Sequence, residues 1–429
     1  MLKNGDGIPV DKKEAARYYK MAIDKGNIEA MINYAQMLDK GDGIPVDKKE
    51  AARYYKMAAN KGNSTAMNNY AFMLDNGDGI PADKKEAARY YKMAANEGNS
   101  SAMNNYAYML YKGDGIPVDK KEAARYYKMA IDKGENAAMN TYATMLYKGD
   151  GIPVYKKEAA RYYKMAIDKG DIDAMNNYAI MLKNGDGIPV DKKEAARYFK
   201  MAANKGNSSA MNNYALMLKN GNGIPADKKE AARYFKMAID KGNSDAMNSY
   251  AFMLDNGDGI PVDKKEAARY YKMAIDKGHS AAIYNYAVML KDGDGIPVDK
   301  KEAARYFKMA IDKGNSDAMH IFASMMYEGD GIPVNKKEAA RYYKIAADKG
   351  NSAAMNNYAF MLDNGDGIPA DKKEAARYYK MAIDKGDIEA MINYASMLDN
   401  GDGIPVDKKE AARYFKMAAN KGNSSAMNN

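Results

Sequence analysis

Apolar side chains recur at helical spacing through the whole chain, in two kinds of stretch that alternate with a combined period of 36 residues. The first kind is represented by 27–40, in which the apolar stripe consists of Ala30, Met31, Tyr34, Ala35 and Leu38. Asn27 precedes this stripe as an N-cap residue and Gly41 follows it, as at many helix C-termini. The pattern predicts an amphipathic helix, which we call helix A.

The second kind of stretch, 48–61, predicts another amphipathic helix, which we call helix B. Asp47 and Glu50 have the spacing of a capping box at its start. One face of the helix carries Ala51, Tyr54, Tyr55 and Ala58, and the other carries Lys49, Arg53, Lys56 and Asn60. Two glycines and a proline separate helix A from helix B and break the helical pattern. We expect Ile44 and Val46 of this loop to reach into the core.

The period holds without a gap. All 12 prolines lie 36 residues apart, from Pro9 to Pro405, and the 36 glycines occur three to a unit. Such a period predicts an all-α solenoid of helix-turn-helix repeats, not two or three globular domains. The boundaries give a partial repeat at 1–26, eleven complete repeats at 27–422 and a partial repeat at 423–429. Because both ends fall inside a repeat, we expect the chain to be a segment of a longer array.

The repeat resembles the Sel1-like repeat, a relative of the tetratricopeptide repeat. The resemblance rests on Ala30, Tyr34, Ala35, Leu38, Gly41 and Gly43 in the first half and on Asp47, Glu50, Ala51, Tyr54, Tyr55, Ala58 and Gly62 in the second. It implies a right-handed α/α superhelix with helix A on the concave side. It also implies a protein-binding adaptor, since proteins of this family act in signalling, in degradation of misfolded proteins at the endoplasmic reticulum and in host-microbe contact.

Composition narrows the classes of function. The formal net charge of +9 is spread over twelve units, so we expect no basic stripe for nucleic acid. No stretch approaches the roughly 18 apolar residues of a membrane span. We expect the first residues not to be a signal peptide, because they match 181–184 inside a later repeat. Cysteine is absent, which excludes disulfides and cysteine-ligated zinc and fits a cytoplasmic location.

Catalysis would need a set of residues that is placed once, and almost nothing in this chain occurs only once. The two histidines, His279 and His320, occupy different positions of the repeat and lack a partner signature for a catalytic set. Loops such as 75–79 lack the ligand spacing of a calcium loop. We therefore expect no enzyme activity, no metal or other cofactor and no small-molecule substrate.

One helix A position varies far more than the others among the copies, and we call it the rung position. Each rung follows the alanine equivalent to Ala35, and it lies one turn after the position of Ile32, which is Asn in most copies but Tyr284, His320 and Ile392 in others. The rung residues are Gln36, Phe72, Tyr108, Thr144, Ile180, Leu216, Phe252, Val288, Ser324, Phe360 and Ser396.

The rungs have two interpretations. They could line a groove that holds an extended peptide or a helix of a partner protein, or they could be tolerant, half-buried positions that pack between neighbouring repeats. The first favours a protein-interaction scaffold, including an adaptor in endoplasmic-reticulum-associated degradation. The second favours a structural spacer or surface-exposed stalk without a specific ligand, which the close similarity of the copies also favours.

Overall fold

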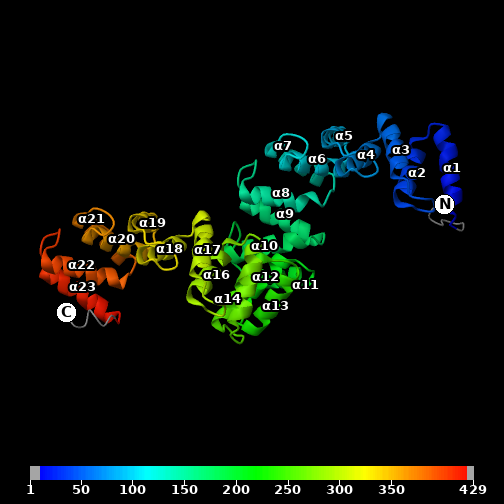
Figure 1. Ribbon diagram of the computed structural model, residues 1–429. Helices are drawn as coiled ribbons and strands as arrows, with labels where there is room; N and C mark the ends of the chain where they lie inside the picture. The colour runs from blue at the N-terminus through cyan, green and yellow to red at the C-terminus, as the bar shows by residue number, and fades with distance from the viewer. Residues whose placement is uncertain (1–9, 423–429) are drawn as a thin grey trace. The chain divides into compact units, whose positions relative to one another are not determined.

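The computed structural model describes residues 10–422, which form 23 helices and no strand (Figure 1). The helix B copies are α1 (Lys12–Asp24), α3 (Lys48–Asn60), α5 (Lys84–Asn96), α7 (Lys120–Asp132), α9 (Lys156–Asp168), α11 (Lys192–Asn204), α13 (Lys228–Asp240), α15 (Lys264–Asp276), α17 (Lys300–Asp312), α19 (Lys336–Asp348), α21 (Lys372–Asp384) and α23 (Lys408–Asn420). The helix A copies are α2 (Ile28–Lys40), α4 (Ser64–Asn76), α6 (Ser100–Lys112), α8 (Ala138–Lys148), α10 (Ile172–Asn184), α12 (Ser208–Asn220), α14 (Ser244–Asn256), α16 (Ser280–Asp292), α18 (Ser316–Glu328), α20 (Ser352–Asn364) and α22 (Ile388–Asn400).

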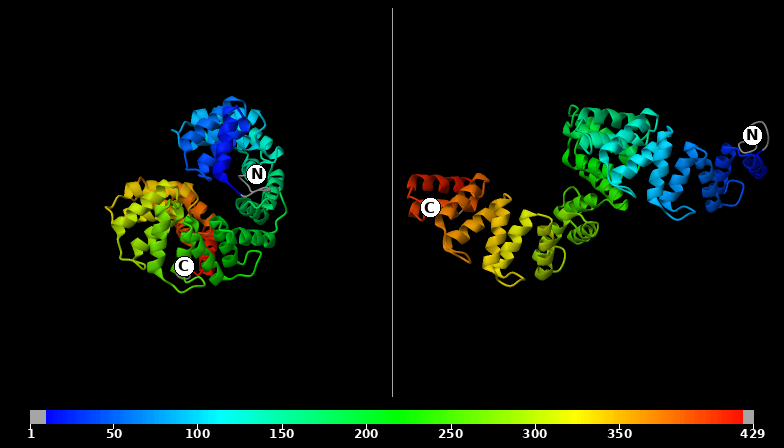
Figure 2. Two further views of the ribbon diagram at one scale, coloured as in Figure 1. Left: turned by 90° about the vertical axis from the view of Figure 1, so that its right-hand side faces the viewer. Right: turned by 90° about the horizontal axis from the view of Figure 1, so that it is seen from above.

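The chain divides into two compact units. One comprises Met1–Ala210 with Asn222–Ile224, and the other Met211–Gly221 with Pro225–Asn429. Within each unit a helix packs against the helices before and after it in the chain (Figures 1 and 2). The predicted all-helical solenoid is therefore confirmed.

The predicted caps begin and end the helices. The side chain of Asn27 accepts a hydrogen bond from the backbone N–H of Ala30 at 2.8 Å, and Gly41 ends α2 in the left-handed conformation, with a φ of 67°. Helix α8 is an exception, because it begins at Ala138 without a side-chain cap and has 11 residues instead of 13. Its copy carries Glu135 where the other copies carry the capping residue.

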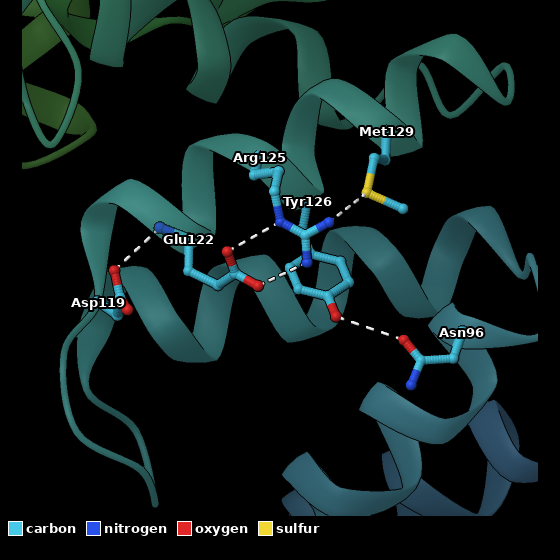
Figure 3. A network of polar contacts seen from close by, with 6 residues as sticks. All are labelled: Asn96, Asp119, Glu122, Arg125, Tyr126 and Met129. Carbon is cyan, nitrogen blue, oxygen red and sulfur yellow. Dashed lines mark hydrogen bonds and ion pairs between the residues drawn. The ribbon is translucent and has the colours of Figure 1, made fainter.

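A polar network covers the solvent face of α7 and recurs, in whole or in part, in other helix B copies (Figure 3). Asp119 accepts from the backbone N–H of Glu122 at 2.9 Å. The Glu122 carboxylate accepts from Nε and Nη2 of Arg125 at 2.8 and 2.6 Å, and the guanidinium lies 4.5 Å from the ring centroid of Tyr126. Cap, ion pair and aromatic ring thus form one continuous contact that shields the helix backbone.

Aromatic side chains join each helix A to the helix B that follows it. Tyr106 and Tyr126 form an edge-to-face pair with ring centroids 4.9 Å apart, and an equivalent pair links the two helices in every other complete repeat. Each such pair contributes about 0.5–1.5 kcal/mol beyond its buried area. The predicted helix B face is also confirmed, since Ala51, Tyr54, Tyr55 and Ala58 are all buried.

The loop between the two helices differs in part from the prediction. Ile44 packs against the core as predicted, but Val46 is 57% exposed, so the prediction that it enters the core is wrong. Val46 instead covers Gly41, where an added Cβ would lie 2.7 Å from its Cγ2. The loop therefore folds back over the C-terminus of helix A.

The second glycine of each loop touches the preceding repeat. A Cβ at Gly79 would lie 2.4 Å from Cβ and 2.9 Å from the backbone oxygen of Lys48. The Nζ of Lys48 bonds Asp78 of the same loop at 2.7 Å. This approach of backbone to backbone fixes the spacing between consecutive repeats.

Candidate functional site

The rung residues lie at one equivalent place on each helix A, as predicted. The four aromatic rungs project into solvent, with exposed fractions of 53% for Phe72, 50% for Tyr108, 44% for Phe252 and 43% for Phe360. The other seven are half-buried. Large aromatic rungs therefore leave much of their area open to another molecule.

A second residue varies together with the rung. It is the second aromatic of the following helix B, 19 residues later in the chain. All three aliphatic rungs, Ile180, Leu216 and Val288, are matched by phenylalanine at this place: Phe199, Phe235 and Phe307. Gln36 and all the aromatic rungs are matched by tyrosine. Comparison of the copies within the sequence would have revealed this pairing, which the sequence analysis missed.

Hydrogen bonds explain the pairing for two of the small polar rungs. Thr144 Oγ1 lies 2.9 Å from the hydroxyl of Tyr163, and Ser324 Oγ lies 2.9 Å from the hydroxyl of Tyr343. Both tyrosines are buried, so each hydroxyl needs a partner inside the protein. Small polar rungs thus supply it, while an aliphatic rung faces a phenylalanine that needs none. Ser396 departs from the pattern, since it is matched by Phe415.

Beside two of the aromatic rungs, the buried tyrosine hydroxyl has no hydrogen-bond partner within residues 10–422. The hydroxyls of Tyr271 and Tyr379, which are matched with Phe252 and Phe360, are buried and have no hydrogen-bond partner among the described residues. A buried unpaired hydroxyl is unfavourable by about 1–3 kcal/mol. Phe252 and Phe360 give these hydroxyls no hydrogen bond, so their presence is not explained by the stability of the fold.

Asparagine carboxamides beside the rungs link successive copies of helix A. Asn105 Nδ2 donates to Asn68 Oδ1 at 3.2 Å, and Asn393 Nδ2 donates to Asn356 Oδ1 at 3.0 Å. Equivalent bonds join Asn177 to Asn140, Asn285 to Asn248 and Asn357 to His320. We call these residues the asparagine ladder. It joins five pairs of successive helix A copies and presents amide groups along the face that carries the rungs.

A cavity of about 310 Å³ opens on this face and is lined by α18, α20 and α22 together with Tyr343 of α19. Its lining includes Phe360, Glu328, Glu389, Tyr327, Asn393 and Met361. Here aromatic, carboxylate and amide groups meet around a single space.

The two histidines have structural partners. The ring of His279 caps α16, with Nδ1 accepting from the backbone N–H of Ala282 at 3.2 Å. His320 occupies an asparagine-ladder position and meets Asn357 at 3.1 Å. Burial lowers the pKa of His320 despite the opposing effect of Asp317 and Asp387. Both rings thus have contacts that asparagine makes elsewhere.

Among residues 10–422, no group of three or more histidine, aspartate or glutamate side chains is arranged to hold a metal ion. Within the same described residues, no helix has the length and apolar character needed to cross a membrane.

Comparison with known families accounts for the whole array. The profile of the Sel1 repeat matches twelve consecutive segments: residues 1–27, 28–63, 64–99, 100–135, 136–171, 172–207, 208–243, 244–279, 280–315, 316–351, 352–387 and 388–423. The chain belongs to the Sel1 repeat family. Sel1 repeats form a scaffold fold that is not itself catalytic and that generally mediates interactions between proteins.

Solved structures of other Sel1 repeat proteins have the same fold. The Escherichia coli protein c5321, a protective antigen of uropathogenic strains, is 22% identical, and the match covers 96% of this chain and 88% of that one with a TM-score of 0.79. A Sel1 repeat protein from Oxalobacter formigenes is 26% identical over 58% of this chain and 100% of its own, with a TM-score of 0.53. No curated protein matches the sequence significantly.

Proposed function

We propose that this Sel1 repeat array is a protein-interaction scaffold that holds an extended segment or a helix of a partner along the helix A face. The observation that carries the proposal is the exposure of the aromatic rungs Phe72, Tyr108, Phe252 and Phe360. Aromatic side chains supply much of the binding energy of protein interfaces. The proposal does not extend to a role in endoplasmic-reticulum-associated degradation, which only the family resemblance favours.

The amide groups beside the rungs support the same function. A carboxamide offers both a donor and an acceptor, which is the hydrogen-bonding capacity of a peptide group. Asn68 of α4 and Asn105 of α6, two successive copies of helix A, are bonded to each other, so they lie in a fixed orientation. Partner main chain could therefore be positioned by the asparagine ladder while its side chains contact the rungs.

Exchange of Phe72, Tyr108 and Phe252 together for serine tests the proposal. We would select linear peptides from a phage-displayed library against the whole chain and measure their affinity by fluorescence anisotropy. Loss of an aromatic anchor weakens binding by about 2 kcal/mol or more, so the triple variant should lose the selected peptides. Its melting temperature should change little, because these rings are already half in solvent.

A matched control changes three exposed lysines of helix B in the same repeats to serine, namely Lys85, Lys121 and Lys265. This variant should retain both peptide binding and stability. If the rung variant still binds the selected peptides, or if it melts far below the unchanged chain, the groove proposal is wrong. The second outcome would mean that the rings pack between repeats.

A structural spacer is the second candidate, because the copies are nearly identical outside the rung and a few other positions. In an array that binds one specific ligand, the copies are expected to differ more in sequence from one another. The same selection separates the two functions. A spacer would yield no peptide that distinguishes the unchanged chain from the rung variant.

A further inference from the structure

The cavity around Phe360 differs from the equivalent place in another repeat. At the other place, Nζ of Lys219 lies 4.7 Å from the ring centroid of Phe252, within the range of a cation–π contact. Lys219 is 33 residues before Phe252, and the residue 33 before Phe360 is Tyr327. The protein thus provides a cation for one exposed phenylalanine and a tyrosine at the same place beside the other.

Charge at the Phe360 cavity is also more negative than at the equivalent place around Phe72. Glu328 lines it where the repeat that precedes Phe72 has Lys40, and Glu389 lines it where the repeat after Phe72 has Ser101. Tyr327 carries no positive charge, and its hydroxyl donates to Asp366 at 2.6 Å. Lys336 bonds the same carboxylate at 2.9 Å and lies 4.9 Å from the Tyr327 ring centroid, outside the lining of the cavity. No lysine or arginine is among the residues that line the cavity. Two carboxylates and an aromatic face therefore surround a space without a cation.

We propose that this cavity binds a lysine or arginine side chain presented by an extended segment of a partner protein. The cation would lie over the Phe360 ring, as Lys219 does over Phe252, and Glu328 and Glu389 would accept its hydrogen bonds. The oxygen of the Asn393 side chain offers a further acceptor at the same wall. This inference rests on the proposed scaffold function and specifies one side chain of the segment that the helix A face would hold.

The test uses the whole chain with ¹³C-labelled methionine methyl groups. Met361 lines the cavity, so its methyl resonance, assigned by loss in Met361→Leu, reports on occupancy. The probes are three peptides, acetyl-Gly-Ser-X-Ser-Gly-amide, in which X is arginine, lysine or citrulline. Citrulline has nearly the shape of arginine without its charge.

We expect the arginine and lysine peptides to shift the Met361 resonance. The citrulline peptide should bind more weakly by a factor of about ten or more, because its hydrogen bonds to the carboxylates carry no charge. Met253 is the internal control, because it follows Phe252, whose ring already has Lys219 beside it. Its resonance should not move.

The matched variant combines Glu328→Lys with Glu389→Ser, the residues found around Phe72. Both glutamates are exposed, so the variant should fold, which an unchanged set of other methionine resonances would verify. It should lose the response to arginine and lysine. Equal binding of citrulline, a response that survives in the variant, or no Met361 shift would each overturn the inference. The scaffold proposal is judged separately, since its rung variant leaves Phe360 in place.

Discussion

The hydroxyl of Tyr163 on α9 lies 2.9 Å from Oγ1 of Thr144 on α8. Thr144 Oγ1 also lies 2.9 Å from the backbone oxygen of Asn140, to which it donates its only hydrogen. Tyr163 is therefore the donor in the shared bond. The half-buried Thr144 thus satisfies a hydroxyl of the core, whereas an aromatic rung such as Phe72 projects into solvent.

Removal of this hydroxyl should have opposite effects in two repeats. Tyr163→Phe deletes a bond and should destabilise its repeat by about 1 kcal/mol. Tyr379→Phe deletes a buried hydroxyl that has no partner among the described residues and should stabilise its repeat by about 1 kcal/mol. Amide hydrogen exchange of α8–α9 and of α20–α21 measures each effect locally. Equal destabilisation by both changes would contradict this account of the rung.

The sequence predicts most of the fold because the determinants are local and repeated. Asp47 and Glu50 lie three residues apart and Gly41 follows the apolar stripe, so the ends of the helices can be read from neighbouring residues. The exposure of a rung such as Phe72 could not be read in this way. It depends on the size of the rung relative to a tyrosine 19 residues away on another helix.

Two further features of the structure could not be predicted from the sequence, because they too depend on contacts between separate segments. Val46 has an apolar side chain in a loop, a pattern that favours burial, but its place is set by how the loop folds back over Gly41. The cavity at Phe360 depends on α18, α20 and α22 together. Neither arrangement follows from the pattern of a single repeat.

Helix α9 should be the least protected helix B at its first turn. Tyr155 occupies its N-cap and provides no side-chain hydrogen bond, whereas Asp119 and Asp191 cap α7 and α11 at 2.9 and 2.8 Å. A missing cap costs about 1 kcal/mol, or roughly fivefold in exchange rate. Amides just after Tyr155 should therefore exchange faster than those after Asp119 or Asp191, and Tyr155→Asp should slow them. Similar rates in all three helices would show that the cap has no influence here.

Gly79 precedes α5 and Gly98 follows it, and substitution by alanine should lower the free energy of unfolding by different amounts at the two places. Gly98 has a φ of 85° and no atom near an added Cβ, so Gly98→Ala should cost only the left-handed conformation, about 1–2 kcal/mol. Gly79 has a φ of 75° and also touches the backbone of Lys48. Gly79→Ala should therefore cost about 1–3 kcal/mol more, because the repeats must move apart. Denaturant melts of the two variants test this, and equal losses would show that the loop adapts easily.

His320 should make its repeat sensitive to mild acid. Burial holds the pKa of His320 below its ordinary value of 6.5 in the folded chain, so the unfolded chain takes up the proton more readily. The contribution of neutral His320 to the free energy of unfolding is therefore fully present above about pH 6.5. It is lost as the pH falls through the lowered pKa of His320. Exchange of the α18–α20 amides, corrected for the intrinsic pH effect, should accelerate between about pH 7.5 and pH 5.

His320→Asn, which restores the residue most copies carry, should remove that acceleration. The amides of α4–α6, where Asn68 and Asn104 hold the same place, provide the reference within each sample. Acceleration that persists in the variant would assign the acid sensitivity to other groups.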